Sequence, residues 1–431
     1  MHFIWLLHSA FGILLLISLV MSLFSIAYYL FDLYFVREER KKLRLMAGVR
    51  APSSAKKDVT AVVPVYNEDP ELFERCVKAI SIEGIRFIIV GDSSLEPYKS
   101  ITEKAGGQFI YIEEHGGKRM ALAEGIKHVD TKYVLFVDSD TVIGKDTVSR
   151  MLPYFSNEVG GVGAKIQVRL DKRRLSTYAL EFFHRLKEFG FAGLEHLGMP
   201  MVLDGECAMY RTELVKNYMQ TNAYRYGLIF GRRMLYADDR QLTAHILDLG
   251  YKAVRAHNVV ASTKAPKTVR AVIRQAVRWT RAGYLYFFKE LLDGTYLKRR
   301  SPIYSFQMVY MYALPVLSLF AFLLRSFETL RRGILGFAFV FQRLSLLILR
   351  LSHFHIAFLL LVISISAISY FVTFIYIYAL AGTIRRRKKR TLSAGGLYLL
   401  LLLFVSVYGL LTFWKQEWKR DAPGGKYSRL S

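Results

Sequence analysis

The chain has 431 residues, of which 53% are hydrophobic and 22% are charged. This combination predicts a protein that is partly in a membrane and partly soluble, and it excludes a disordered chain, a collagen and a disulfide-bonded secreted module. The 60 lysines and arginines exceed the 35 acidic residues, and the net charge of +25 suits nucleic acid, anionic lipid or an anionic substrate, with the apolar tracts weighing against nucleic acid.

The first predicted element is one long membrane helix. No charged residue occurs between Phe3 and Phe31, and as a helix this run is about 43 Å long, more than one bilayer core of ~30 Å but too short for two spans and a turn. By the positive-inside rule, residues 1–36 cross the membrane with the amino end outside and the next segment in the cytosol. The rule rests here on the basic residues that follow the run, Arg37, Arg40, Lys41, Lys42 and Arg44.

Residues 55–265 are predicted to form a soluble, cytosolic α/β domain. Short β-branched runs alternate with helical stretches, at Val59–Val65, Phe87–Val90, Phe109–Ile112, Tyr133–Val137 and Gly160–Val168. Polar residues follow several runs, and parallel sheets place ligands at such strand ends. The two cysteines, Cys76 and Cys207, are too few for a disulfide framework and indicate a reducing compartment.

The remaining residues return to the membrane. Residues 266–300 are basic and aromatic, which favours an amphipathic helix at the cytosolic membrane surface. Residues 301–415 then contain three candidate spans, and residues 416–431 form a tail. Together with the amino-terminal helix this makes four spans, which places both termini outside. The stretch 335–349 is either an interfacial or re-entrant helix, which we favour, or a fifth span. The spans are Ile303–Leu324, Ile356–Ala381 and Leu397–Trp414, with the basic run Arg385–Arg390 and residues 391–396 in a cytosolic loop.

Two pairs of carboxylates are candidates for chemistry. Asp138 and Asp140 follow a hydrophobic run and can hold a hard divalent cation against a diphosphate, although a solvated turn has the same residues. Asp238 and Asp239 precede a predicted helix at Gln241–Leu249 and can supply a general base. Their alternative is an anionic cap at a helix amino terminus.

Three further clusters are weaker signals when taken singly. Polar residues end the first two runs, as in any loop, and Lys118 follows two glycines, in a place suited to a nucleotide or to a plain turn. A third cluster puts an amide, a guanidinium and an indole within one helical turn, which suits a diphosphate beside a sugar or an anchor at a membrane surface. The polar residues after the first two runs are Tyr66, Glu68 and Asp92, the cation is Lys118, and the helical cluster is Gln275, Arg278 and Trp279.

In this order and spacing, the motifs resemble the inverting glycosyltransferases of family 2, and among them the membrane-embedded synthases of hyaluronan, cellulose and chitin. The resemblance covers about residues 55–300 and is closest to hyaluronan synthases around Gly205–Arg211 and Asp238–Thr243. It implies a GT-A fold inserted between transmembrane helices, a UDP-sugar donor, and Mg²⁺ or Mn²⁺ as the cofactor.

The resemblance also implies a role for each matching residue. Asp239 matches the general base that deprotonates the acceptor hydroxyl, with Asp238 as its neighbour. Asp138 meets the nucleotide and, with Asp140, the metal. The uridine is held by Tyr66, Glu68, Asp92 and Lys118, while the diphosphate is covered and the acceptor mouth completed by Gln275, Arg278 and Trp279, with Cys207 nearby.

These features predict a processive polysaccharide synthase of the plasma membrane that extends a growing glycan and exports it through its own helices. Its partners are then the sugar donor, the glycan and the bilayer, with no nucleic acid; the oligomeric state is left open. One alternative is a nonprocessive transferase acting on a lipid-linked or short glycan acceptor. A remote alternative is a noncatalytic transporter or scaffold.

Overall fold

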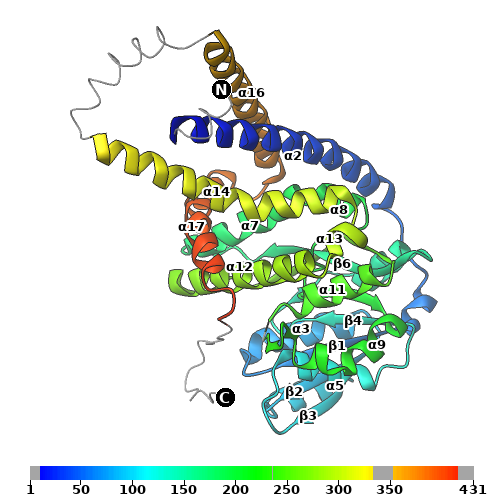
Figure 1. Cartoon of the computed structure of the whole chain (residues 1–431). Coiled ribbons are helices and arrows are strands. Elements are labelled where there is room, and N and C mark those ends of the chain that lie inside the picture. The colour runs from blue at the N-terminus through cyan, green and yellow to red at the C-terminus, as the bar shows by residue number, and fades with distance from the viewer. Residues whose placement is uncertain (1–9, 235, 333–352, 416–431) are drawn as a thin grey trace.

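The computed structural model describes residues 10–234, 236–332 and 353–415. A mixed α/β domain is flanked in the sequence by long apolar helices, which gather on one side of the domain (Figure 1). The α/β class predicted from the sequence is confirmed. The interfacial or re-entrant helix expected at 335–349 lies outside the described residues, as does the tail at 416–431.

The domain is built on an eight-stranded sheet of order β3-β2-β1-β4-β7-β6-β10-β5. β1 pairs in parallel with β2 and β4, and β2 with β3, whereas β7 runs antiparallel to β4 and β6. Strands β5, β7 and β10 were not predicted from the sequence. The strands are β1 Val59–Val65, β2 Arg86–Asp92, β3 Gln108–Ile112, β4 Tyr133–Val137, β5 Val142–Ile143, β6 Val159–Val168, β7 Cys207–Arg211 and β10 Lys252–Thr263, with β8 Leu228–Ile229 and β9 Arg232–Arg233 as a separate pair.

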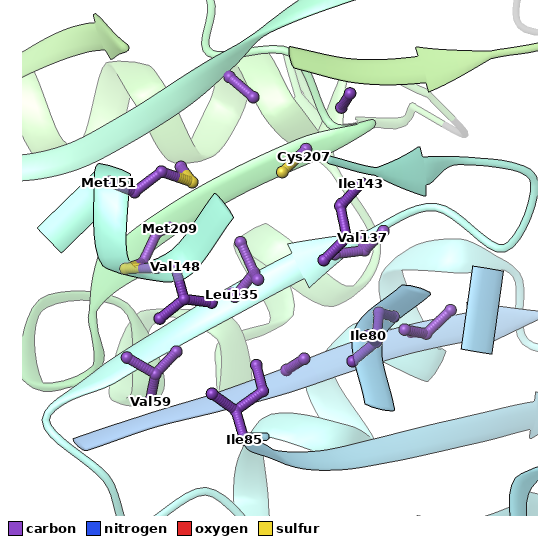
Figure 2. Close-up of a cluster of buried hydrophobic side chains, with 14 of the residues drawn as sticks. Val59, Ile80, Ile85, Leu135, Val137, Ile143, Val148, Met151, Cys207 and Met209 are labelled. Carbon is purple, nitrogen blue, oxygen red and sulfur yellow. The ribbon is translucent and has the colours of Figure 1, made fainter. Parts of the chain in front are cut away.

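Helices cover both faces of the sheet, so central strands such as β1 and β4 are buried on both sides. Along β1, alternate side chains pack toward α3 on one face, while Val62 packs toward α5 on the other. Figure 2 shows the first of these clusters, with Val59, Ile80 and Leu135. The helices of the domain are α3 Pro70–Ile82, α4 Tyr98–Lys104, α5 Lys118–Lys127, α6 Thr147–Met151, α7 Leu175–Gly190, α8 Ala192–His196, α9 Thr212–Gln220, α10 Asn222–Arg225 and α11 Asp238–Asp248.

Among the described residues, four helices are long and apolar enough to cross a membrane. The first, α2, extends from Ala10 to Met46 and continues past the apolar run through the basic residues that follow it. Between the domain and the next candidate span lie α12 and the short α13, in the region where the sequence predicts an amphipathic helix at the membrane surface. The bounds are α12 Val269–Leu292, α13 Thr295–Lys298, α14 Pro302–Arg332, α16 His353–Thr383 and α17 Lys388–Leu410.

The last of these helices, α17, packs against α12, the helix that follows the α/β domain. Ala394 shares a buried cluster with Ala276, and the ring of Phe413, just beyond α17, lies 5.0 Å from that of Phe288. Arg390 donates a hydrogen bond to the backbone oxygen of Lys172, so the basic run contacts the α/β domain. Residues 391–396 were expected in a loop and are instead helical, because α17 begins at residue 388.

The contact between Arg390 and the α/β domain leads to a prediction about sidedness. A cysteine at the exposed position Ser393 should react with a membrane-impermeant maleimide only when the cytosolic face is open, as in inverted vesicles. The native thiols are both buried and give little background. Leu411→Cys, at the other end of α17, should label in intact cells if α17 crosses the bilayer. Labelling of Ser393→Cys in intact cells would contradict a cytosolic domain.

Candidate active site

Three neighbouring parallel strands carry polar side chains to one edge of the sheet. Tyr66 and Glu68 follow β1, Asp92 ends β2, and Asp138 follows β4. These strands are adjacent in the order β2-β1-β4. Parallel sheets bind ligands at this edge, so the fold brings together several of the residues that the resemblance assigned to the donor nucleotide.

Lys118 is the cation that joins the carboxylates of this edge. It is the first residue of α5, and its Nζ lies 2.6 Å from Asp138 Oδ1 and 3.3 Å from Asp238 Oδ2. Burial alone would lower the pKa of Lys118, but the two carboxylates hold that pKa well above its usual range. The helix can begin here because Gly117 has a φ of 85°, a left-handed conformation that favours glycine.

The two adjacent carboxyls at the start of α11 have different electrostatic environments. Burial and the charge of Asp238 raise the pKa of Asp239 to about 6. Burial would raise the pKa of Asp238 too, but Lys118 and Arg119 lower it below its usual value. The backbone N–H of Arg240 donates to Asp239 Oδ1 at 2.7 Å and orients that carboxyl. Asp238 is therefore the charged partner of the lysine, and Asp239 is suited to accept a proton near neutral pH.

Gly205 allows the lysine and the carboxylates to come close together. A Cβ at this position would lie 3.1 Å from Lys118 Nζ and 3.3 Å from Asp239 Cβ, so the neighbours would have to move. The small pocket between these groups is lined by Lys118, Leu122, Phe136, Val137, Asp138, Gly205, Ala208, Tyr210, Asp238, Asp239 and Leu242.

Asp92 organises the glycine-rich loop before α5. Its two carboxylate oxygens accept hydrogen bonds from the backbone N–H groups of Gly116 and Gly117, at 2.8 and 2.9 Å. His115 Nδ1 lies 2.9 Å from the same carboxylate, and the His115 ring stacks on that of Tyr66 with centroids 4.0 Å apart. Asp92 therefore fixes the loop that presents Lys118, and Tyr66 and His115 present a stacked aromatic pair beside it.

A second lysine, Lys264, bridges two predicted site residues and was missed by the sequence reasoning. It contacts Glu68 Oε1, and its Nζ lies 3.9 Å from Asp140 Oδ2. Lys264 follows directly after β10, at the end of a strand that was not predicted. A correct prediction of β10 would have placed this lysine at the same edge of the sheet.

The available oxygen ligands fit a divalent cation of the magnesium type. The carboxylates of Asp138 and Asp140 remain 28% and 24% exposed, and each faces a lysine ammonium, the charge that a metal ion would supply. Within residues 10–234, 236–332 and 353–415 there is no group of three or more His, Cys, Asp or Glu that could hold a metal. Mg²⁺ and similar ions are commonly held by one or two carboxylates, with substrate phosphates and water completing the shell.

Of the residues expected around the acceptor, three lie together on one helix, and the fourth lies in the core of the domain. Gln275, Arg278 and Trp279 lie on one turn of α12, and the Trp279 indole stacks on Phe183 of α7 with centroids 5.2 Å apart. Trp279 thus already has an aromatic partner on the helix that packs beside it. Cys207 does not line the pocket: it is fully buried in the core cluster on the α3 face of the sheet.

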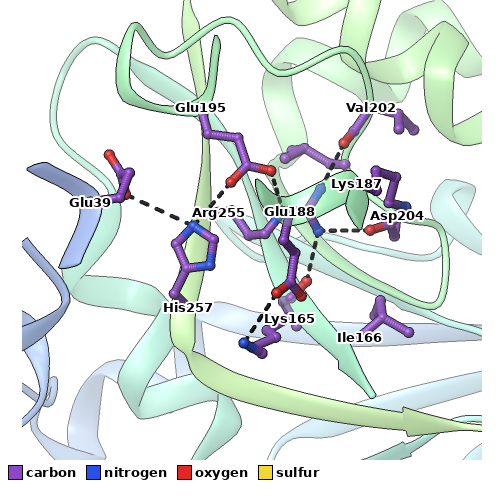
Figure 3. A network of polar contacts seen from close by, with 12 residues as sticks. Glu39, Lys165, Ile166, Lys187, Glu188, Glu195, Val202, Asp204, Arg255 and His257 are labelled. Carbon is purple, nitrogen blue, oxygen red and sulfur yellow. Dashed lines mark hydrogen bonds and ion pairs between the residues drawn. The ribbon is translucent and has the colours of Figure 1, made fainter. Parts of the chain in front are cut away.

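Asp204, the residue before Gly205, belongs to a buried network of ion pairs that extends to Glu39 of α2 (Figure 3). Arg255 on β10 lies 2.7 Å from Asp204 and 2.6 Å from Glu195, and both of its partners are buried. His257 lies 3.0 Å from Glu195 and 3.9 Å from Glu39 of α2. Arg255 also donates to the backbone oxygens of Ala164 and Val202. The segment before β7 is therefore held in place by buried ion pairs, since Asp204 pairs both with Arg255 and with Lys187 of α7.

Comparison with known proteins assigns the chain to a family. The family described as "Glycosyltransferase like family 2" matches residues 56–282, more than half of the chain. The chain belongs to this family. Membership agrees with the resemblance seen in the motifs, and the matched segment contains every site residue discussed above.

The relatives of this family-2 protein support a glycosyltransferase in general more than a hyaluronan synthase in particular. It is 29% identical over 239 residues to an N-acetylglucosaminyltransferase of Azorhizobium caulinodans, covering 52% of this chain and 59% of that protein. It is 25% identical over 312 residues to hyaluronan synthase 3 of Xenopus laevis, covering 60% of this chain and 55% of that one. The chain thus spans little more than half the length of these relatives.

A solved structure shares the fold over nearly the whole chain. The mannosyltransferase PcManGT from Pyrobaculum calidifontis, in complex with GDP-Man and Mn²⁺, covers 92% of this chain and 99% of its own, with a TM-score of 0.55 and 16% identity. At this identity the likeness shows the fold alone. The family-2 protein is thus a GT-A-like α/β domain flanked by apolar helices.

Proposed function

We propose that the chain is a membrane-embedded inverting glycosyltransferase that transfers a sugar from a UDP donor to a growing glycan. The observation that carries this proposal is the cluster in which Lys118 joins Asp138 to Asp238, with Asp239 beside it. The relatives named N-acetylglucosaminyltransferase make UDP-N-acetylglucosamine the first donor to test. A catalytic domain at residues 55–265, between membrane segments, is part of the same proposal.

In the proposed reaction, the acceptor hydroxyl attacks the anomeric carbon of the donor. A bond forms between the acceptor oxygen and that carbon, and the bond from the carbon to the diphosphate oxygen breaks, with the electron pair leaving on the diphosphate. The hydroxyl proton passes to Asp239, whose pKa of about 6 suits a general base. Lys118 stabilises negative charge at the diphosphate, as do Arg278 and Gln275 from α12.

Asp138 and Asp140 would hold Mg²⁺ or Mn²⁺, which neutralises diphosphate charge when bound. Tyr66 and His115 would receive the base of the nucleotide on their stacked rings. Asp92 and Glu68 then act as positioning residues, because Asp92 orders the loop before Lys118 and Glu68 holds Lys264 beside Asp140.

Loss of the Asp140 carboxylate should show whether this residue binds the metal ion. Asp140→Asn is expected to weaken Mn²⁺-dependent UDP binding by at least about ten-fold, because the metal loses a charged ligand. Isothermal titration of UDP with and without Mn²⁺ measures the effect. Asp146→Asn is the control, since it removes the same charge from the left-handed position before α6, which asparagine tolerates. An unchanged Mn²⁺ requirement in Asp140→Asn would remove Asp140 from the metal site.

Product size over time tests whether the transfer is processive. A synthase that exports its product should release long chains from the start of the reaction, and their length should depend on donor concentration. The four apolar helices found among the described residues support this form of the proposal. Products of one or two added sugars at every time point would instead establish the nonprocessive alternative, on a lipid-linked or short glycan acceptor.

A further inference from the structure

A cavity of about 350 Å³ lies where α2 and α16 meet, away from the candidate active site. Leu33 and Val36 of α2 and Ala379 of α16 form its apolar wall, and both helices are candidate membrane spans. The cavity begins just past the apolar run of α2, on the part of that helix that leads into β1. It therefore lies at the level where lipid headgroups meet the α/β domain's side of the bilayer.

The other wall of the cavity is basic. Arg37, Arg40, Lys41 and Arg44 line it, all on the outward face of α2, and all four side chains are exposed. Lys41 pairs with Glu38 at 2.7 Å. For the part of the chain that the structure describes, no hydrogen bond or ion pair joins the guanidinium of Arg37, Arg40 or Arg44 to another side chain. Arg37 interacts with Glu38 only beyond the range of an ion pair, so these guanidiniums can bind an anion beside the apolar wall.

We infer that this cavity binds the headgroup of an anionic phospholipid, with the phosphate on the arginines and the acyl chains along Leu33, Val36 and Ala379. Guanidinium groups bind phosphate oxygens in a bidentate manner, and basic pockets between spans on the cytosolic side suit anionic headgroups. The apolar wall selects a lipid over a soluble phosphate. This site is independent of the transfer reaction, since none of its residues lines the pocket around Asp239.

The opposite face of the same segment of α2 packs against the α/β domain. Glu39 is buried and lies 3.1 Å from His196 of α8, so α2 is fixed against the domain while Arg40 and Arg44 face outward. A lipid bound at the arginines would therefore contact a helix whose position is already fixed. Preformed geometry reduces the cost of ordering the arginine side chains on binding.

Native mass spectrometry of the full chain, released from nanodiscs of mixed phosphatidylcholine and phosphatidylglycerol, tests the inference. The wild type should retain phosphatidylglycerol in preference to phosphatidylcholine. Arg40→Gln and Arg44→Gln should each weaken retention about five-fold, the effect of one surface cation on anionic lipid. Lys42→Gln removes one charge from the same helix outside the cavity and should leave retention unchanged.

Three results would overturn the inference. Equal losses in Lys42→Gln and Arg40→Gln would mean diffuse surface attraction without a site. Equal retention of both lipids would mean that the headgroup charge is not recognised. Displacement of phosphatidylglycerol by millimolar inorganic phosphate would identify a site for a soluble anion. Donor turnover is not the readout, so failure here leaves the proposed transfer reaction unaffected.

Discussion

Asp239→Asn is expected to reduce sugar transfer by about 10²–10⁴-fold, the usual contribution of a positioned general base. The asparagine keeps the shape of the side chain and can still accept the Arg240 N–H, but it cannot take the acceptor proton. UDP affinity should change little, because Asp238 and Asp138 remain paired with Lys118. Steady-state turnover and UDP titration on the same preparation measure the two effects.

The pH dependence of the wild type follows from Asp239 together with Asp138, because burial also raises the pKa of Asp138 to about 6. The pKa of Asp239 is raised to about 6, so the carboxyl is protonated and inactive below that pH and ionised above it. Transfer should therefore rise as the pH increases through about 6. Asp130→Asn, an exposed aspartate of the domain, should leave both turnover and this profile unchanged. A loss of UDP affinity in Asp239→Asn equal to its loss of turnover would contradict the role of base.

The largest expected effect on stability comes from Arg255→Met. Methionine fills a similar volume but removes the cation that Asp204 and Glu195 share, which leaves Asp204 with Lys187 and Glu195 with His257 as remaining partners. Loss of one partner from a buried ion pair typically costs about 3–5 kcal/mol. The midpoint of thermal unfolding of the purified protein measures it. The variant also loses the two hydrogen bonds that the guanidinium donates to the backbone oxygens of Ala164 and Val202.

Lys252→Met provides a matched control on the same strand. Lys252 lies 2.6 Å from Glu158, but both side chains are more than half exposed. Water screens such a pair, so its loss should cost less than about 1 kcal/mol. Equal shifts in the two variants would show that the buried network does not hold the segment before β7. An intact unfolding midpoint in Arg255→Met would contradict the proposed role of Arg255 directly.

The sequence alone was sufficient for those parts of the fold that show regular hydrophobic patterns. Strands such as β1 and β4 are continuous apolar runs, and their predicted ends match the structure. β10 was missed because its sequence contains Arg255, His257 and Asn258, and because its register shifts beyond Ala256. Charged residues normally indicate surface, and only the folded chain shows that these are paired inside.

The candidate site was predictable where a motif fixed it and not where it depends on distant contacts. The order of the motifs identified Lys118, Asp138 and Asp239, which the structure brings to one pocket. Lys264 depends on the unpredicted β10. Cys207 was assigned to the acceptor mouth by resemblance, yet the alternation of side chains along β7 turns it into the core. A position in a motif does not determine the face on which its side chain lies.

The most direct test of the central claim is the release of UDP from UDP-N-acetylglucosamine by the purified protein with Mn²⁺ and a glycan acceptor. Release should be stimulated by the acceptor, be accompanied by labelled sugar in the product, and be lost in Asp239→Asn. GDP-mannose and other UDP-sugars complete the donor panel. Binding of a donor without acceptor-dependent release from any member of the panel would contradict a glycosyltransferase built on Lys118, Asp138 and Asp239.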